Sequence, residues 1–548
     1  MTHTPTTGAV VCEHTTASAI GAEILKSGGN AVDALIAVVL AVGVLAPYHS
    51  CIGGGGFALV RTPEKWDVID FRSCAPAATT MDNFMAHTSP HGGHAVAVPG
   101  EIKGLYRLHQ QYGKAEWASL FAPSVKLSRG TRMGRDLYDF VARECPNAPS
   151  IEGSWMADDP EFVRAFSRDG RLIQVGEVWA REDYADVLEA IGERGPEAFY
   201  GGEVAGNIVK AVQGRGGVMS LNDLEKYTPI NREPLSTTFR GHEVFSVPAP
   251  ASGAALLGAL KTLDSFPLSN PLSVEDEHVT VEAMRLAFGA RTELGDPAYV
   301  PVDAVQAAML RGASDRVQEK TQAPEYYLPG AVGVDDNGTS SMAAADASGL
   351  VVSLTTTIGT SWASRIMVPG AGMVLNDSVL DFTVKGRPNV WGYAPAPANF
   401  VAGSHRPLSS MCPYIVLKDG EPVAAGGAAG GATIPSANIL AVRNMLAYNL
   451  GAGEALALPR IHNQVLPNVT LLEQSSDRGR RVVGLGRDVV RGLEKRGHVV
   501  EWCERSRATP CAMRILPDGY DTGGDARKWD AGGAVCVGGK VTVQNHPA

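Results

Sequence analysis

The spacing of hydrophobic and polar positions predicts helices in the first part of the chain. One helical pattern runs from residue 15 to residue 26 and stops at Gly28-Gly29. The next covers residues 31–45, AVDALIAVVLAVGVL, which is nearly all apolar and is typical of a buried helix. A third helix is expected to begin at Glu101, after Val98-Pro99-Gly100.

Strand patterns interrupt these helices and dominate after Thr339. The expected strands cover residues 51–62, 66–73, 364–370, 372–377 and 413–427. Residues 217–250 predict a Ser-capped helix that leads into a long hairpin. Helices return at residues 437–449 and 488–496. Consecutive strands with helices on both sides predict an α+β fold, a layered sandwich with central antiparallel sheets.

Length and charge add limits on domains and partners. A chain of 548 residues suggests three or four domains, yet no long linker, charge block or internal repeat divides it. Its 45% hydrophobic and 19% charged residues are typical of a globular protein with a sizeable core. The net charge of -10 is spread along the chain, which argues against nucleic acid or an anionic membrane as a partner.

Targeting and metal signals are weak. The N-terminus lacks a basic region followed by an apolar one, and the apolar stretch from Ala31 is too short to span a bilayer, so a cytoplasmic protein is expected. Eight cysteines without C-x-x-C spacing suit free thiols rather than disulfides or a zinc site. The HGGH sequence, with His91 and His94, lacks further ligands at metal spacing, so no metal or other cofactor is expected.

The chemically richest stretch is GTSSMAAADASGLVVSLTTTIGTS, residues 338–361, which predicts two strands joined at residues 346–349. Its many hydroxyls are open to two interpretations. Thr suits a pleated surface and Ser suits turns, which requires no chemistry. Alternatively, one Thr is a nucleophile, activated because cleavage of the Gly338-Thr339 bond frees its own α-amine as the base. Gly338 would tolerate the strained backbone that such a bond needs.

Three further motifs remain ambiguous by themselves. The sequence GGAAGG, residues 426–431, follows an apolar strand and precedes a helix, which fits either an oxyanion hole or a plain glycine turn. RPLSSMCP, residues 406–413, places two hydroxyls before a strand, which also fits a Ser turn. Arg72 follows an apolar strand, where it would close a structural ion pair or bind a substrate carboxylate.

Taken in order, these segments resemble the γ-glutamyltranspeptidase family, N-terminal-nucleophile hydrolases that mature by autocleavage before a Thr. The motifs that carry the resemblance are GGNAVDA, IGGGGFALV, DFRSCAP, AVPG, HQQYG, REPLSTTFRGHEVFSVPAPASG, EAMRLAFGAR, GDPAYV, VVSLTTTIGTS, VPGAGMVLND, RPLSSMCP and the closing glycine pairs. The resemblance implies a four-layer αββα sandwich. It also implies that residues 1–338 and 339–548 become a large and a small subunit, intertwined in one domain.

The resemblance assigns roles residue by residue. The nucleophile falls on Thr339 and the Thr that hydrogen-bonds it on Thr357, and the oxyanion-hole glycines match Gly430 and Gly431. The substrate-binding residues match Arg72 for the carboxylate, Asp381 for the α-amino group, and the paired serines Ser409 and Ser410.

Departures from the family pattern gather where the substrate amine would bind. Gly359 stands where the family commonly has Asn, Ser378 where it has Gln, and Ser341 where it has His, while Ser340 keeps a hydroxyl. A charge-assisted hydrogen bond contributes roughly 1.5 to 3 kcal/mol, so a γ-glutamyl substrate is expected to bind more weakly than in the family at large.

Three functions follow as hypotheses. The first is cleavage of a γ-glutamyl or related amide. The second applies the same Thr chemistry to a carboxylate-bearing biosynthetic intermediate with an altered amine, by cleavage of an amide or a C–C bond; Gly359 and Ser378 favour this idea. The third is an inactive binding module, against which the retained Thr339 and Thr357 argue. In the first two hypotheses the substrate is a small molecule with a free carboxylate.

Overall fold

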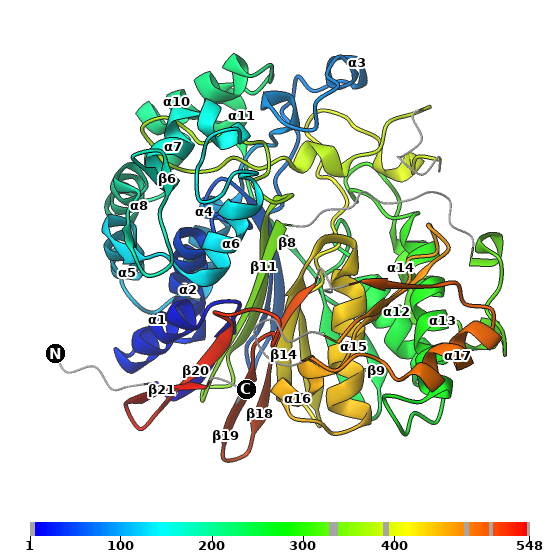
Figure 1. Cartoon of the computed structure of the whole chain (residues 1–548). Helices are drawn as coiled ribbons and strands as arrows, with labels where there is room; N and C mark the ends of the chain where they lie inside the picture. The colour runs from blue at the N-terminus through cyan, green and yellow to red at the C-terminus, as the bar shows by residue number, and fades with distance from the viewer. Residues whose placement is uncertain (1–5, 328–337, 387–393, 476–481, 504–507, 545–548) are drawn as a thin grey trace.

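Two large antiparallel sheets occupy the middle of the computed structural model, which describes residues 6–327, 338–386, 394–475, 482–503 and 508–544 (Figure 1). The first sheet has the order β21-β20-β1-β11-β12-β2-β3-β8 and the second the order β19-β18-β14-β13-β10-β9. Strands β11 and β12 contact β14, and β11 also contacts β18, so the two sheets face each other. Both sheets mix strands from before and after residue 338.

The strand bounds follow sheet by sheet. The first sheet contains β1 (Gly8–Cys12), β2 (Gly55–Arg61), β3 (Trp66–Asp70), β8 (Ile230–Arg232), β11 (Gly338–Asp346), β12 (Val351–Gly359), β20 (Gly532–Val537) and β21 (Lys540–Gln544). The second contains β9 (Leu235–Phe239), β10 (His242–Ser246), β13 (Tyr414–Lys418), β14 (Glu421–Ala429), β18 (Thr509–Leu516) and β19 (Gly519–Gly523). A small third sheet contains β15 (Ile461–His462), β16 (Thr470–Glu473) and β17 (Val500–Cys503).

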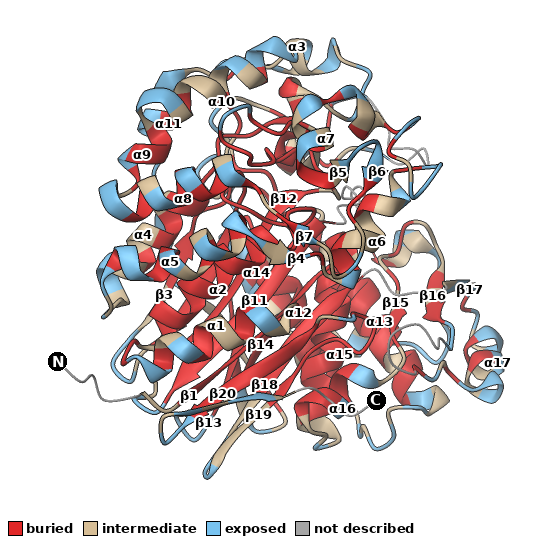
Figure 2. Ribbon diagram, turned by 60° about the vertical axis from the view of Figure 1, so that its left-hand side comes forward, coloured by how far each residue is buried: buried red, intermediate tan, exposed pale blue. Residues whose placement is uncertain are grey.

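Helices flank the paired sheets on both sides (Figure 1). On the side of the first sheet lie α1 (Thr15–Lys26), α2 (Ala31–Leu45), α4 (Glu101–Tyr112), α5 (Trp117–Arg129), α8 (Glu182–Arg194) and α10 (Gly202–Gly214). On the side of the second lie α12 (Gly253–Leu263), α13 (Val274–Arg291), α14 (Asp303–Leu310), α15 (Ile434–Ala447), α16 (Ala452–Ala457) and α17 (Arg487–Lys495). Figure 2 shows the central strands fully buried and the exposed residues on the outer faces of the helices. Within the described residues, no helix is long and apolar enough to cross a membrane.

Strand alternation sends neighbouring side chains of β11 into different cores. Met342 and Ala344 pack in the core that includes α2, whereas Ala343 and Ala345 pack in the core shared with the second sheet. Thr339 is in phase with the second pair, so its side chain faces the space between the sheets. This alternation is what aims the candidate nucleophile.

The sequence-based elements are mostly confirmed. The helices at 15–26 and 31–45, the helix start at Glu101, and the hairpin of residues 338–359 form as expected. The helices expected at 437–449 and 488–496 are the ones that form over Ile434–Ala447 and Arg487–Lys495. The strands expected at 364–370 and 372–377 were wrong: this segment makes only an isolated bridge, because positive φ angles at Arg365, Gly370 and Gly372 turn the backbone. The coarse expectation of a mixed helix and sheet protein with central antiparallel sheets is confirmed.

Candidate functional site

The site begins with a chain of three groups at the start of β11. The Thr339 hydroxyl donates to Thr357 Oγ1 at 3.1 Å, and the Thr357 hydroxyl in turn donates to the carbonyl oxygen of Gly338. The backbone N–H of Gly359 also donates to Thr357 Oγ1, at 2.8 Å. Both threonines are buried. The hydroxyl of Thr357 is therefore held in one orientation, in which its hydrogen points at the carbonyl oxygen of Gly338, in the peptide bond that precedes Thr339.

The ladder between β11 and β12 is irregular at this peptide bond. Gly338 pairs with Gly359 and Thr339 pairs with Thr357, so Ile358 is an extra residue opposite the Gly338-Thr339 bond. A Cβ atom on Gly338 would lie 2.5 Å from the carbonyl oxygen of Thr360 and 2.6 Å from that of Gly359. Glycine is needed here because no side chain fits.

Gly430 and Gly431 lie at the same end of the inter-sheet space. Ser353 lies opposite Ala343 in the ladder between β11 and β12, and its hydroxyl donates to the carbonyl of Gly426 at 2.8 Å. The next glycine of β14, Gly427, packs against Ser341, which is two residues nearer to Thr339. Strand β14 therefore runs toward Thr339 as it approaches its end at Ala429. Gly430 and Gly431 follow with φ values of 119° and 59°, which glycine tolerates best.

Buried Arg72 forms an ion pair with Asp381, which is half-buried. Arg72 Nη2 bonds the Asp381 carboxylate, its Nη1 donates to Ser378 Oγ at 3.3 Å, and its Nε donates to the carbonyl of Pro407 at 3.4 Å. Burial raises the pKa of Asp381, and the Arg72 guanidinium opposes this shift. Both interpretations of Arg72 stay open, because the residue closes an ion pair with the very group expected to hold the substrate amine. Ser378 lies on the guanidinium, at the carboxylate side of the site.

Gly359 does not leave an open space. Its φ is 105°, and a Cβ atom there would lie 1.6 Å from Asp377 Oδ1. The Asp377 carboxylate accepts hydrogen bonds from the N–H of Thr360 at 3.0 Å and from its hydroxyl at 2.5 Å. Burial raises the pKa of Asp377 to about 7. Sequence reasoning missed Asp377, although its position just before Ser378 was a signal.

Ser409 and Ser410 lie beside a second guanidinium that sequence reasoning also missed. Arg291 Nη2 donates to Ser410 Oγ at 3.1 Å, and its Nε donates to Ser252 Oγ at 2.6 Å. The Ser252 hydroxyl donates to the carbonyl of Ser409. Burial lowers the pKa of Arg291 to about 10, while Asp381 acts in the opposite direction. No carboxylate forms an ion pair with Arg291 in the described part of the chain.

A buried ionic cluster lies behind the nucleophile, on the helix-facing side of β11. The Ser340 hydroxyl bonds the Glu13 carboxylate, which also accepts from Lys528 Nζ at 3.1 Å. Although burial raises the pKa of Glu13, the Lys528 ammonium and His49 bring it below its usual range. The cluster joins both ends of the chain to the residue next to Thr339.

Comparison with solved structures defines the class of protein. The chain superposes on cephalosporin acylase from Bacillus halodurans with a TM-score of 0.82, at 26% identity, over 99% of this chain and 97% of that one. The two share the fold of the N-terminal-nucleophile hydrolases.

Sequence comparison narrows the class to a family. The family model of γ-glutamyltranspeptidase matches residues 17–535. A glutathione hydrolase proenzyme of Arthroderma benhamiae is 36% identical, over 96% of this chain and 92% of the relative. A glutathione hydrolase of Aspergillus flavus is 34% identical, over 97% and 90%. The chain thus belongs to the γ-glutamyltranspeptidase family, as its motifs predicted, and is an enzyme of the hydrolase and transferase kind.

Proposed function

We propose that the chain is a precursor that cuts its own Gly338-Thr339 bond and then uses Thr339 to cleave an amide in a carboxylate-bearing substrate. The observation that carries this proposal is the hydrogen-bonded chain from Thr339 through Thr357 to the carbonyl of Gly338. The relative from Arthroderma benhamiae is described as a proenzyme, which supports a precursor that is processed.

In the first step, Thr339 Oγ1 attacks the carbonyl carbon of Gly338. Negative charge then develops on the carbonyl oxygen that already accepts from Thr357, which is the geometry that stabilises an oxyanion. As the Gly338 C–Thr339 N bond breaks, the nitrogen of Thr339 takes the proton that Oγ1 loses, so the acyl group moves from nitrogen to oxygen, and water hydrolyses the resulting ester. The products are a Gly338 carboxylate and a free α-amine on Thr339.

In the second step, that α-amine takes the proton of Oγ1 while the oxygen attacks the acyl carbon of the substrate. The N–H groups of Gly430 and Gly431 would stabilise the oxyanion, and water or an amine would then release the acyl group. Arg72 would bind the substrate carboxylate through Nε and Nη1, whose present bonds of 3.4 and 3.3 Å are long. Asp381 would hold the amine.

Residues 1–338 and 339–548 would stay together after cleavage. Strand β11 lies between β12 and β1, and β10 pairs with β13, so strands of both segments alternate in both sheets. Separation would break these ladders and expose both cores. The four-layer αββα arrangement and a cytoplasmic location complete the proposal.

The decisive experiment follows the purified chain over time by intact mass. Two fragments should accumulate, the smaller one beginning at Thr339, while Thr339→Ala stays a single chain because it lacks the attacking hydroxyl. Thr360→Ala is a matched control, since it removes a neighbouring hydroxyl that bonds Asp377 instead. A wild-type chain that stays intact would overturn the proposal.

A second candidate function is favoured by Asp377. Asp377 Oδ1 occupies the place that a side chain at position 359, commonly Asn in the family, would fill, so the polar groups on the amine side are arranged differently, which fits a biosynthetic substrate with an altered amine. A mature wild-type enzyme should then hydrolyse a chromogenic γ-glutamyl anilide slowly.

Restoration of the family residues tests this second candidate. Gly359→Asn alone should lower activity further, because its Cβ would overlap Asp377 Oδ1. Gly359→Asn with Asp377→Ala and Ser378→Gln should raise anilide hydrolysis, because the clash is removed and two hydrogen-bonding groups return. Rapid anilide hydrolysis by the unmodified enzyme would instead establish the first candidate, γ-glutamyl cleavage.

A further inference from the structure

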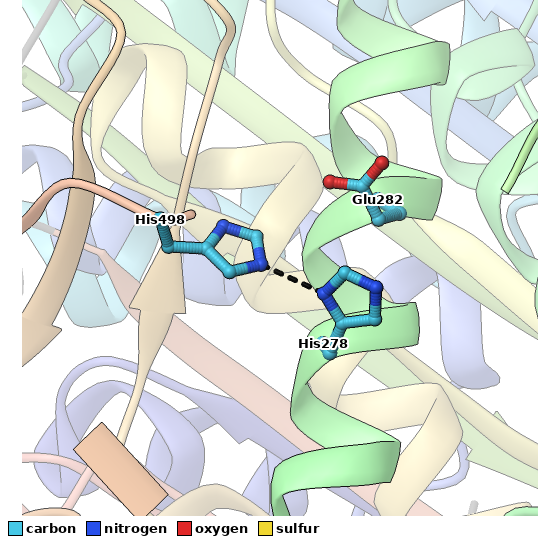
Figure 3. Close-up of side chains that lie close together, drawn as sticks. All are labelled: His278, Glu282 and His498. Atoms are coloured by element: carbon cyan, nitrogen blue, oxygen red, sulfur yellow. Dashed lines mark hydrogen bonds between the residues drawn. The ribbon is translucent and has the colours of Figure 1, made fainter. Parts of the chain in front are cut away.

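Three side chains that can each bind a metal ion, those of His278, Glu282 and His498, lie close together away from the nucleophile site. They belong to α13 and to the connection from α17 to β17 (Figure 3). His278 and Glu282 lie one turn apart on the same face of α13. His498 follows Gly497, whose positive φ ends α17 and turns the chain toward α13. Nδ1 of His278 and Nε2 of His498 are 2.8 Å apart, and one potential ligand atom from each of the three side chains lies within 4.8 Å of the others.

The hydrogen bonds around this cluster leave one polar atom unsatisfied. Glu282 Oε2 accepts from the hydroxyl of Tyr327 at 2.5 Å, but Glu282 Oε1 is buried and has no hydrogen-bond partner among the residues that the structure describes. Glu282 is fully buried. A buried carboxylate oxygen without a donor costs free energy, so it requires an explanation. A bound cation supplies one.

The hydrogen bonds of His278 leave one of its ring nitrogens free of a proton. Nε2 of His278 lies 2.8 Å from the carbonyl oxygen of Gln318, which only accepts, so Nε2 carries the proton and the Nδ1 lone pair points at His498. A neutral imidazole has one protonated nitrogen and one nitrogen with a lone pair, and that lone pair is what binds a metal ion.

We propose that His278, Glu282 and His498 form a binding site for a divalent transition-metal ion of the Zn²⁺ type. Two imidazole nitrogens and one carboxylate oxygen are a donor set that zinc takes, with water in the fourth position. Tetrahedral zinc separates two nitrogen ligands by about 3.3 Å, so the rings need to part by only about half an ångström from their present contact. The Nε2 proton of His498 would move to Nδ1 of the same ring, which lies 3.4 Å from Thr470 Oγ1. The ion would then bind the freed nitrogen and give Glu282 Oε1 its partner.

Such a site would link the two segments of the chain. His278 and Glu282 precede residue 338, whereas His498 follows it, so the ion would hold together the fragments of a cleaved chain. Sequence reasoning expected no metal, because the two histidines are 220 positions apart and form no local motif. This site does not depend on self-cleavage, and its test is separate from that of the proposed function.

The experiment uses the full chain, stripped of metal with EDTA and then given ZnCl2 or CoCl2. Elemental analysis should find about one ion per chain, and Co²⁺ should give the visible absorption bands of a tetrahedral nitrogen and oxygen site. Zn²⁺ should raise the Tm by several degrees, because it binds only the folded state. Glu282→Gln and His498→Gln should each weaken metal binding at least tenfold.

The control variant addresses binding at the protein surface. His94 stacks on His87 near His91, so His94→Gln removes the most obvious competing group and should leave metal binding unchanged. Loss of the bound ion in His94→Gln would place the metal at that surface group and overturn the proposal. Absence of bound metal and of a Co²⁺ spectrum in the folded wild type would equally overturn it, whatever the variants do, and would leave a hydrogen-bonded histidine pair only.

Discussion

Thr357→Val removes one hydroxyl at nearly constant shape, and it tests the proposed self-cleavage most directly. The Thr357 hydroxyl accepts from Thr339 and from the N–H of Gly359, and it donates to the carbonyl of Gly338. Valine keeps the β-branched shape that suits a strand but supplies no donor at this position near the end of β12. The carbonyl oxygen that becomes negative in the transition state thus loses this hydrogen bond.

The expected magnitude follows from that lost donor. Removal of one preorganised oxyanion donor slows acyl transfer by about 100- to 1,000-fold, or roughly 2.7 to 4 kcal/mol. A precursor that matures within an hour should then need days. Thr357→Ser keeps the hydroxyl and should mature within about tenfold of the wild-type rate, because only a methyl group is lost.

The assay is a time course of intact mass on freshly purified precursor, with N-terminal sequencing of the small fragment. Thermal unfolding of each uncleaved variant separates slow chemistry from misfolding. If Thr357→Val matures at the wild-type rate while remaining folded, then Thr357 does not stabilise the transition state and the hydrogen-bonded chain is only structural.

Three other changes have distinct expected outcomes. Arg72→Lys loses the planar fork and should raise KM at least tenfold without affecting self-cleavage; an unchanged KM on the true substrate would make Arg72 structural. Gly338→Ala should nearly abolish maturation, because its Cβ has no room, and normal maturation would contradict this packing. Burial raises the pKa of Glu101 to about 8, against about 4.3 when unfolded, so the folded state binds the extra proton between these values. Stability should therefore fall from pH 5 to pH 8, by up to about 1.4 kcal/mol per pH unit. Glu101→Gln should flatten this slope in urea titrations, and an unchanged slope would refute the assignment.

Several parts of this protein follow from local sequence. The helix at residues 31–45 is fixed by an apolar stretch of helical length between Asn30, which caps it, and a turn at residues 46–50. The hairpin that begins at Gly338 is fixed by the β-branched residues of its second strand, VVSLTTTIG, and by a short polar turn. Thr339 stood out as a candidate because of its place at the start of that hairpin. These features depend on residues within about twenty positions of one another.

Contacts between distant residues were decided only by the tertiary structure. The irregular register at Gly338, the ion pair of Arg72 with Asp381 and the carboxylate of Asp377 in the place beside Gly359 all depend on how separate segments pack. The pairing of His278 with His498 depends on the packing of α17 against α13. Local periodicity says which face of an element is buried, but not which distant side chain meets it there. That choice is made by the packing of the whole chain, because burial forces each polar atom to find a partner among the residues that the fold brings close.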